Sequence, residues 1–172
     1  MEKAAPDPAL LDRLSGLEPH AWSGTVWRHT FADNKPEKTN ARGARWNPPG
    51  VEVLYTSLDR ATAIAEADHL LEIQPVRPRA KRTIHRLQIR LKSVLDLSDR
   101  ALLASLGVDD EALSSDDHSR CQAVGGAAAF LQSDGIIVPS ARSPGQNIVI
   151  LFGRAHPLPA VWVVESEVLD RA

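Results

Sequence analysis

The stretch GARWNPPGVEVLYTSLDRATAIAE, residues 43–66, carries the signals that decide how this chain folds. It opens with a cluster of turn-forming residues, NPPG at 47–50, which is expected to hold Arg45 and Trp46 in a fixed pose. Residues 51–57 follow with β-branched and alternating side chains, a pattern that predicts a strand. A turn and a strand are therefore expected side by side, with a cation and an aromatic ring between them.

A helix is expected directly after that strand. Ser57 or Asp59 can cap it, and its apolar and small residues run to about Ile73. Glu66 lies in the middle of this helix among apolar neighbours. Its carboxylate is either on a solvated face or held for use near Tyr55, and the pattern alone leaves both interpretations open.

Two shorter segments are expected to complete the site. Residues 23–31 have the composition of a strand, in which Arg28 shares a face with the β-branched Val26. This alternation is equally compatible with an inward arginine and with an edge arginine in water. Residues 136–138 form a strongly apolar strand, and Ser140 follows at its end.

The order of the remaining elements predicts an α+β fold with mixed, mostly antiparallel sheets and packed helices, because no regular alternation of strand and helix is present. Further strands are expected at residues 87–92, 147–152 and 161–164, and further helices at residues 7–16, 98–107 and 119–133. Two adjacent glycines in the last helix, Gly125 and Gly126, indicate a close contact between backbones. The length of 172 residues predicts a single domain, with a core at about 22–165 and residues 1–20 as a helical appendage.

Composition and charge exclude several classes of protein. A net charge of −2 gives no electrostatic case for direct binding of nucleic acid or of a membrane surface. No stretch approaches the ~20 apolar residues of a membrane span, and the N-terminus lacks the apolar run of a signal peptide. Cys121 is the only cysteine, so an internal disulfide is excluded and a reducing cytoplasm is expected.

The absence of several motifs narrows the chemistry. The histidines show no metal-ligand spacing, so no metal site is expected. Neither a dinucleotide-binding glycine motif nor a P-loop is present, and Ser140 lacks the surroundings of a nucleophilic serine. What remains is chemistry performed by arginines, an aromatic ring, a carboxylate and hydroxyls.

These residues, in this order and spacing, resemble the RES domain family, which is named for its arginine, glutamate and serine. The resemblance covers roughly residues 22–152 and departs from the family at Leu151-Phe152, where members often carry Asn-Pro. The matching positions are Trp27-Arg28, Gly43-x-Arg45-Trp46-Asn47-Pro48-x-Gly50, Leu54-Tyr55-x-Ser57, Ala65-Glu66, Gln122-x-x-Gly125, Val138-Pro139-Ser140 and Asn147.

The resemblance implies a toxin of a toxin–antitoxin pair that uses NAD as substrate and has a fold similar to the ADP-ribosyltransferases. It implies no cofactor beyond NAD, and a helix-turn-helix antitoxin as protein partner. Glu66 and Arg45 would be catalytic, with Glu66 acting at the reacting ribose. The residues that it implies for NAD binding are Arg28, Arg45, Tyr55, Ser140, Trp46 and Asn147, and Gln122 would have a structural role.

The residue types suit this chemistry. Cleavage of the nicotinamide–ribose bond gives an oxocarbenium-like sugar that a carboxylate stabilises. Arginine binds diphosphate in a bidentate manner, and an aromatic face orients a flat ring.

The acceptor of the ADP-ribosyl group stays open between water, phosphate and a protein side chain. Arginine as acceptor is disfavoured by Ile64, which stands where arginine-directed transferases typically carry a second Glu or Gln. A non-catalytic nucleotide- or partner-binding module is the alternative, and a domain with ordinary surface ion pairs is a third hypothesis.

Overall fold

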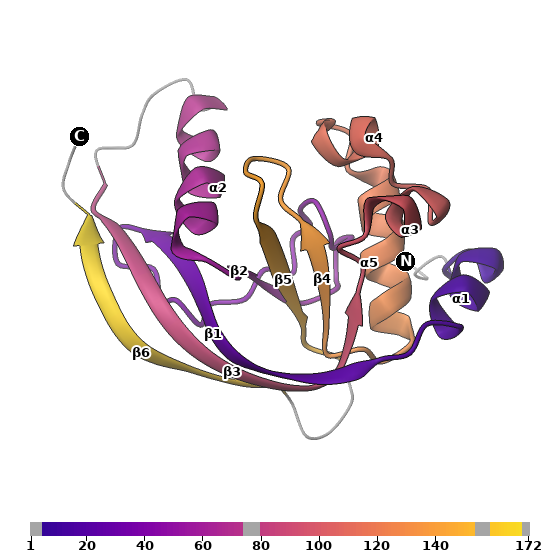
Figure 1. Cartoon of the computed structure of the whole chain (residues 1–172). Helices are drawn as coiled ribbons and strands as arrows, with labels where there is room; N and C mark the ends of the chain where they lie inside the picture. The colour runs from indigo at the N-terminus through magenta and orange to yellow at the C-terminus, as the bar shows by residue number, and fades with distance from the viewer. Residues whose placement is uncertain (1–4, 74–79, 154–158, 170–172) are drawn as a thin grey trace.

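The computed structural model describes residues 5–73, 80–153 and 159–169, which form one six-stranded sheet and five helices (Figure 1). The strands are β1 (His20–Phe31), β2 (Val53–Ser57), β3 (Arg82–Asp96), β4 (Gly135–Pro139), β5 (Gln146–Leu151) and β6 (Ala160–Leu169). The helices are α1 (Pro8–Ser15), α2 (Arg60–Ile73), α3 (Arg100–Ser105), α4 (Asp110–Ser114) and α5 (Ser119–Phe130).

The sheet closes on itself. Its strand order is β1-β2-β5-β4-β3-β6, and β1 also pairs with β3, so that five strands form a ring and β6 extends it at the edge. All pairs are antiparallel apart from β3 with β4. The predicted α+β class with mostly antiparallel pairing is therefore confirmed.

Two apolar clusters lie on opposite faces of β2, β4 and β5. Alternation along β5 sends Ile148 and Ile150 to the smaller cluster, to which every strand of the ring contributes, and Val149 and Leu151 to the larger one. The larger cluster is completed by helices, above all by α5. These strands are apolar on both faces because both faces are covered.

Helix α1 begins and ends as the sequence predicts. Asp7 caps it by accepting a hydrogen bond from the Ala9 amide at 3.0 Å, and Gly16 follows its last turn. Instead of standing apart as the expected appendage, the helix buries Leu10 and Leu14 in the larger cluster. Its apolar face thus packs on the body of the protein.

Some element boundaries differ from those expected. Strand β1 begins at His20, and β3 and β6 are longer than predicted, because β3 pairs along most of its length with both of them. The acidic connection 109–117 contains the short helix α4. Asp99 caps α3 by accepting from the Leu102 amide at 2.8 Å, while Ser98 donates to Asp96 instead. The segment 74–82, whose basic residues and two prolines predict an exposed loop, lies mostly outside the described residues.

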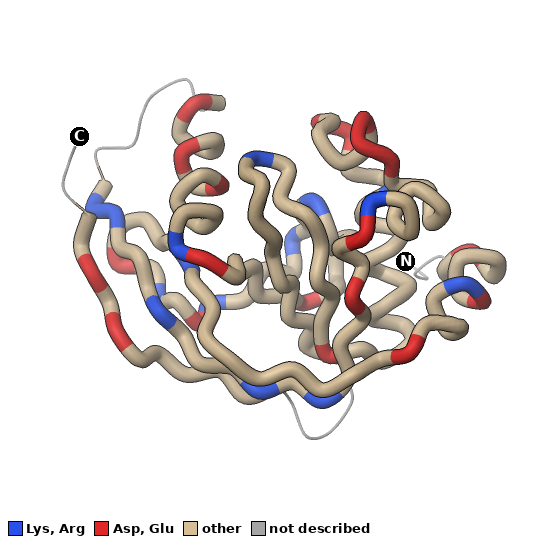
Figure 2. Tube along the Cα trace, in the orientation of Figure 1, with Lys and Arg blue, Asp and Glu red and all other residues tan. Residues whose placement is uncertain are grey.

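Acidic and basic residues are interspersed along the chain, with acidic positions on α2 and around α4 (Figure 2). Among the helices that the structure describes, none is both long enough and apolar enough to cross a membrane.

Candidate active site

A cleft of about 940 Å³ opens between α2, the end of β1, the segment after β1 and the turn between β4 and β5. The turn between β4 and β5 stands between α2 and α4 (Figure 1). All predicted site residues border this cleft except Ser140, which lies directly behind Glu66 and is 2% exposed. The bordering predicted residues are Arg28, Arg45, Trp46, Tyr55, Glu66 and Asn147.

The Glu66 carboxylate is held by two donors. Its Oε1 atom accepts hydrogen bonds from Ser140 Oγ at 2.6 Å and from Asn147 Nδ2 at 2.8 Å. The Asn147 amide is itself oriented, because its Oδ1 accepts from Ser57 Oγ at 2.7 Å. The carboxylate is thus positioned by side chains from β2, β5 and the end of β4.

The backbone explains why these groups meet. Asn147 of β5 lies opposite Ser57 in the β2–β5 pair and opposite Val138 in the β4–β5 pair. Helix α2 begins directly after β2, with Asp59 accepting from the Thr62 amide at 2.8 Å. The chain order of strand, cap and helix therefore brings Glu66 over the ends of β4 and β5.

Tyr55 is anchored through its hydroxyl group. The hydroxyl donates to Asn47 Oδ1 at 2.6 Å and accepts from the Trp46 amide at 2.9 Å. Burial raises the pKa of the Tyr55 phenol, so the ring is neutral at ordinary pH. The anchored hydroxyl fixes the plane of a ring that borders the cleft.

Asn47 is a site residue that sequence reasoning did not select. It is fully buried, and its Nδ2 donates to the Val51 carbonyl at 2.8 Å while its Oδ1 accepts from Tyr55. The sequence feature that could have identified Asn47 is its position as the first residue of the NPPG turn. Its role is to join that turn to β2.

Arg28 contributes a cation to the lining of the cleft. Its Nη1 donates to the Tyr55 carbonyl at 2.7 Å and its Nη2 to the Lys38 carbonyl at 3.2 Å, while its buried Nε has no partner among the described residues. Within that part of the chain no carboxylate pairs with it. Burial lowers the pKa of Arg28 to about 10, so the guanidinium stays charged and suits an anionic ligand.

Arg45 and Trp46 are engaged in holding the site together. Arg45 Nη1 donates to the Leu113 carbonyl at 2.5 Å and to the Ser115 carbonyl at 3.0 Å, which joins the turn to α4. Trp46 is 2% exposed, and its side chain belongs to the larger apolar cluster. The Trp46 ring therefore has little exposed surface with which to make the expected contact with substrate, although the residue borders the cleft.

Helix α5 supports the same turn from behind. Gln122 Nε2 donates to the Ala44 carbonyl at 2.9 Å, in keeping with the structural role expected for it. A Cβ atom built on Gly125 would lie 1.7 Å from the Trp46 carbonyl oxygen, so the two backbones touch as the paired glycines predict.

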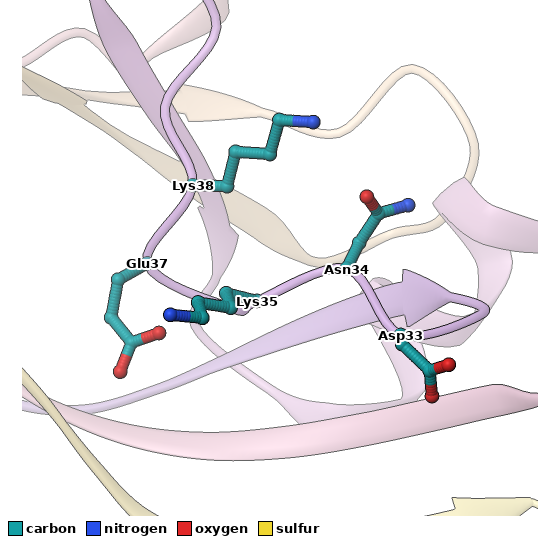
Figure 3. Close-up of a pocket in the computed structure, with 5 residues that line it drawn as sticks. All are labelled: Asp33, Asn34, Lys35, Glu37 and Lys38. Carbon is teal, nitrogen blue, oxygen red and sulfur yellow. The ribbon is translucent and has the colours of Figure 1, made fainter.

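A smaller pocket of about 420 Å³ adjoins the cleft in the polar loop after β1 (Figure 3). The residues lining it are Asp33, Asn34, Lys35, Glu37 and Lys38. Its exposed side chains carry both signs of charge, and it contains none of the predicted catalytic groups. No cluster of His, Cys, Asp and Glu side chains suited to a metal ion occurs within residues 5–73, 80–153 and 159–169.

The chain matches a known family over most of its length. The family model described as the RES domain matches residues 11–170. The NAD(+) phosphorylase MbcT of Mycobacterium tuberculosis is 29% identical over 166 residues, which cover 88% of this chain and 86% of that protein. The probable NAD(+) phosphorylase Rv3189 of the same organism is 31% identical over 166 residues, covering 92% of this chain and 78% of that protein.

A solved structure is similar over nearly the whole chain. It comes from the crystal structure of the M. tuberculosis MbcT–MbcA toxin–antitoxin complex, with a TM-score of 0.82 and 26% identity. The match covers 96% of this chain and 94% of the other. The match to the family model and the similarity to these relatives show that this chain belongs to the RES domain family.

Proposed function

We propose that this protein is an NAD-consuming toxin that cleaves the nicotinamide–ribose bond and transfers the ADP-ribosyl group to inorganic phosphate. The observation that carries the proposal is the Glu66 carboxylate, held by Ser140 and Asn147 in the cleft that also contains Arg28. Phosphate as acceptor is supported by the names of the two relatives, both NAD(+) phosphorylases.

The reaction needs a carboxylate and a cation in the places where the cleft has them. The C1–N bond between ribose and nicotinamide breaks, its electron pair goes to the nicotinamide nitrogen, and positive charge develops on the ribose. Glu66 would stabilise that charge, while Arg28 would bind the diphosphate. A phosphate oxygen then forms the new bond to C1, giving nicotinamide and ADP-ribose 1-phosphate.

An antitoxin partner is the second part of the proposal. The similar solved structure is a toxin–antitoxin complex. In this protein the rim of the cleft exposes Leu70 and Ile73 of α2, at 47% and 61%. Apolar side chains beside a charged cleft are suited to a protein that covers it, and the family resemblance implies a helix-turn-helix protein. The buried free thiol of Cys121 suits the reducing cytoplasm as the place of action.

The test is NAD turnover by the purified chain, free of antitoxin, with and without inorganic phosphate. NAD labelled in the adenylate part should give ADP-ribose 1-phosphate only when phosphate is present. Glu66→Gln should lower turnover by about 100-fold or more while the melting temperature changes little, because the charge is lost and the shape is kept.

The matched control is Glu72→Gln, which removes the same charge from an exposed position on the same helix. It should turn over NAD like the wild type. Full activity of Glu66→Gln would refute the assignment of the carboxylate. Label on a protein band in cell lysate would identify a side chain as acceptor, and free ADP-ribose alone would identify water.

A further inference from the structure

The turn between β4 and β5 presents an arginine to the cleft that the chemistry above does not use. Arg142 borders the cleft, two residues beyond Ser140. Its backbone amide donates to Ser140 Oγ at 3.0 Å, and the Ser143 amide donates to the same oxygen at 3.2 Å. The hydroxyl that holds Glu66 thus also fixes the backbone from which the Arg142 side chain projects.

The Arg142 guanidinium has no hydrogen-bond or ion-pair partner within the described part of the chain. Asp116 borders the cleft as well, yet no ion pair joins the two residues. Arg45, which also borders the cleft, has Nη1 committed to backbone carbonyls of the α4 region. Arg142 therefore has its full donor set available for a ligand.

Charged groups of both signs lie around Arg142. His118 also borders the cleft, and its pKa is lowered by burial, then by Arg45 and further by Arg142, against the opposing effect of Asp116 and Asp117. Arg45 and Arg142 are thus close enough to His118 to add positive potential in this part of the cleft, while Asp116 and Asp117 oppose it. Arg28 also borders the cleft, where its Nη1 donates to the Tyr55 carbonyl.

Arg28 and Arg142 give the cleft two candidate anion positions, and the Arg142 backbone is linked to Glu66 through Ser140 Oγ. Phosphorolysis needs two such positions, since the diphosphate of NAD and the attacking phosphate are both present when the bond to C1 forms. We propose that Arg142 binds the acceptor phosphate and directs one of its oxygens toward the ribose carbon at Glu66. This inference rests on the proposed function and adds to it the residue that selects phosphate over water.

The kinetic test uses inorganic phosphate as the varied substrate at saturating NAD. Arg142→Gln should raise the KM for phosphate about tenfold or more and leave the KM for NAD within about twofold, because only one of the two anions loses its partner. The product should shift from ADP-ribose 1-phosphate toward ADP-ribose. Arg142→Lys, which keeps the charge and loses the bidentate fork, should fall between this variant and the wild type.

The control is Arg120→Gln, which removes an equal charge from an exposed α5 position outside the cleft, where the side chain donates to the Gly107 carbonyl at 3.4 Å. Its two KM values should match those of the wild type. An unchanged KM for phosphate in Arg142→Gln overturns the inference, as does an equal rise in the KM values for phosphate and NAD.

A binding measurement separates this inference from the proposed function. Inorganic phosphate is titrated into the Glu66→Gln protein saturated with NAD, with and without Arg142→Gln, and followed by ³¹P NMR. Saturable binding that disappears with Arg142→Gln supports the inference even if wild-type turnover proves independent of phosphate. Equal binding with and without Arg142, or no binding at all, overturns it even if phosphorolysis is observed.

Discussion

Ser140 is one of the two residues whose side chains hold the Glu66 carboxylate. Its hydroxyl donates to Glu66 Oε1 and accepts from the amides of Arg142 and Ser143. A hydroxyl group has one donor and two acceptor positions, so the three contacts use its whole capacity. At 2% exposure Ser140 is a positioning residue and has almost no surface with which to contact substrate.

Ser140→Ala should lower NAD turnover about 10- to 100-fold, because Glu66 loses one of its two donors. The variant should also lose about 1 kcal/mol of stability, since two part-buried backbone amides lose their acceptor. The measurements are kcat with NAD and the urea midpoint. Ser23→Ala, at an exposed position on β1, should change neither. Wild-type turnover by Ser140→Ala would show that Asn147 alone suffices to orient the carboxylate.

Sequence reasoning succeeds for residues whose surroundings are local. Alternation predicts the strand that carries Tyr55 and the cap predicts the helix that carries Glu66, while the direction of the Glu66 carboxylate stays open in the sequence pattern. Local reasoning fails for Arg45, because the carbonyls that it contacts lie 68 and 70 residues further along the chain. It fails for Trp46 because a tryptophan that follows an arginine gives no sign of whether its ring is needed in the core or in the cleft.

At the scale of elements, α5 and the turn at residues 43–50 act as one support. Gly125 lies against the Trp46 carbonyl. Gly126 lies against the ring of Pro48, where a Cβ atom built on the glycine would be 3.2 Å from the nearest ring carbon. The adjacent glycines in the sequence predict a close approach, because glycine is unfavourable in a helix without one. The partner could not be predicted, since nothing local identifies which backbone approaches the helix.

Gly125→Ala should be among the most destabilising single substitutions in this protein. The added methyl group would stand 1.7 Å from a backbone oxygen, so α5 or the turn must move, at a cost of about 3 kcal/mol or more. The urea midpoint measures the loss, and NAD turnover should fall with it because Tyr55 is bonded to the same turn.

Gly126→Ala is the matched control. Its methyl group meets two ring carbons of Pro48 at 3.2 and 3.5 Å and no backbone atom, and alanine gains about 1 kcal/mol of helix propensity over glycine, so the net change should be small. Equal stabilities of the two variants would contradict the close packing of α5 on the turn.

At the scale of the whole molecule, the ring of strands is held by pairings far apart in sequence. Strand β1 pairs with β3 over most of its length, and the register brings His29 opposite Ile84. The composition predicts the strands but not this closure, because pairing between distant segments leaves no local mark. The boundaries of β1, β3 and β6 were underestimated for the same reason.

A polar network joins the ring to the helix that carries Glu66. Arg82 of β3 donates from Nε to His29 Nε2 at 3.1 Å and from Nη2 to Asp68 of α2 at 2.6 Å. His29 must be neutral to accept that bond. Burial, together with the Arg82 charge, lowers the pKa of His29 to about 4 from its ordinary 6.5, and burial also lowers the pKa of His85 and His118.

Stability should therefore fall as the pH drops from about 6.5 toward about 4. In that window these histidines take up protons in the unfolded chain but not in the folded chain, so a lower pH favours unfolding. Above about pH 6.5 the histidines are neutral in both states, and their contribution to stability is fully present. Urea midpoints at roughly pH 7.5 and roughly pH 5 measure the difference. His29→Gln should reduce it, while His20→Gln, at the exposed start of β1, should leave it unchanged. If the urea midpoint of His29→Gln differed between the two pH values as much as that of the wild type, acid would destabilise the protein through other groups. His29 would then not couple the ring of strands to α2.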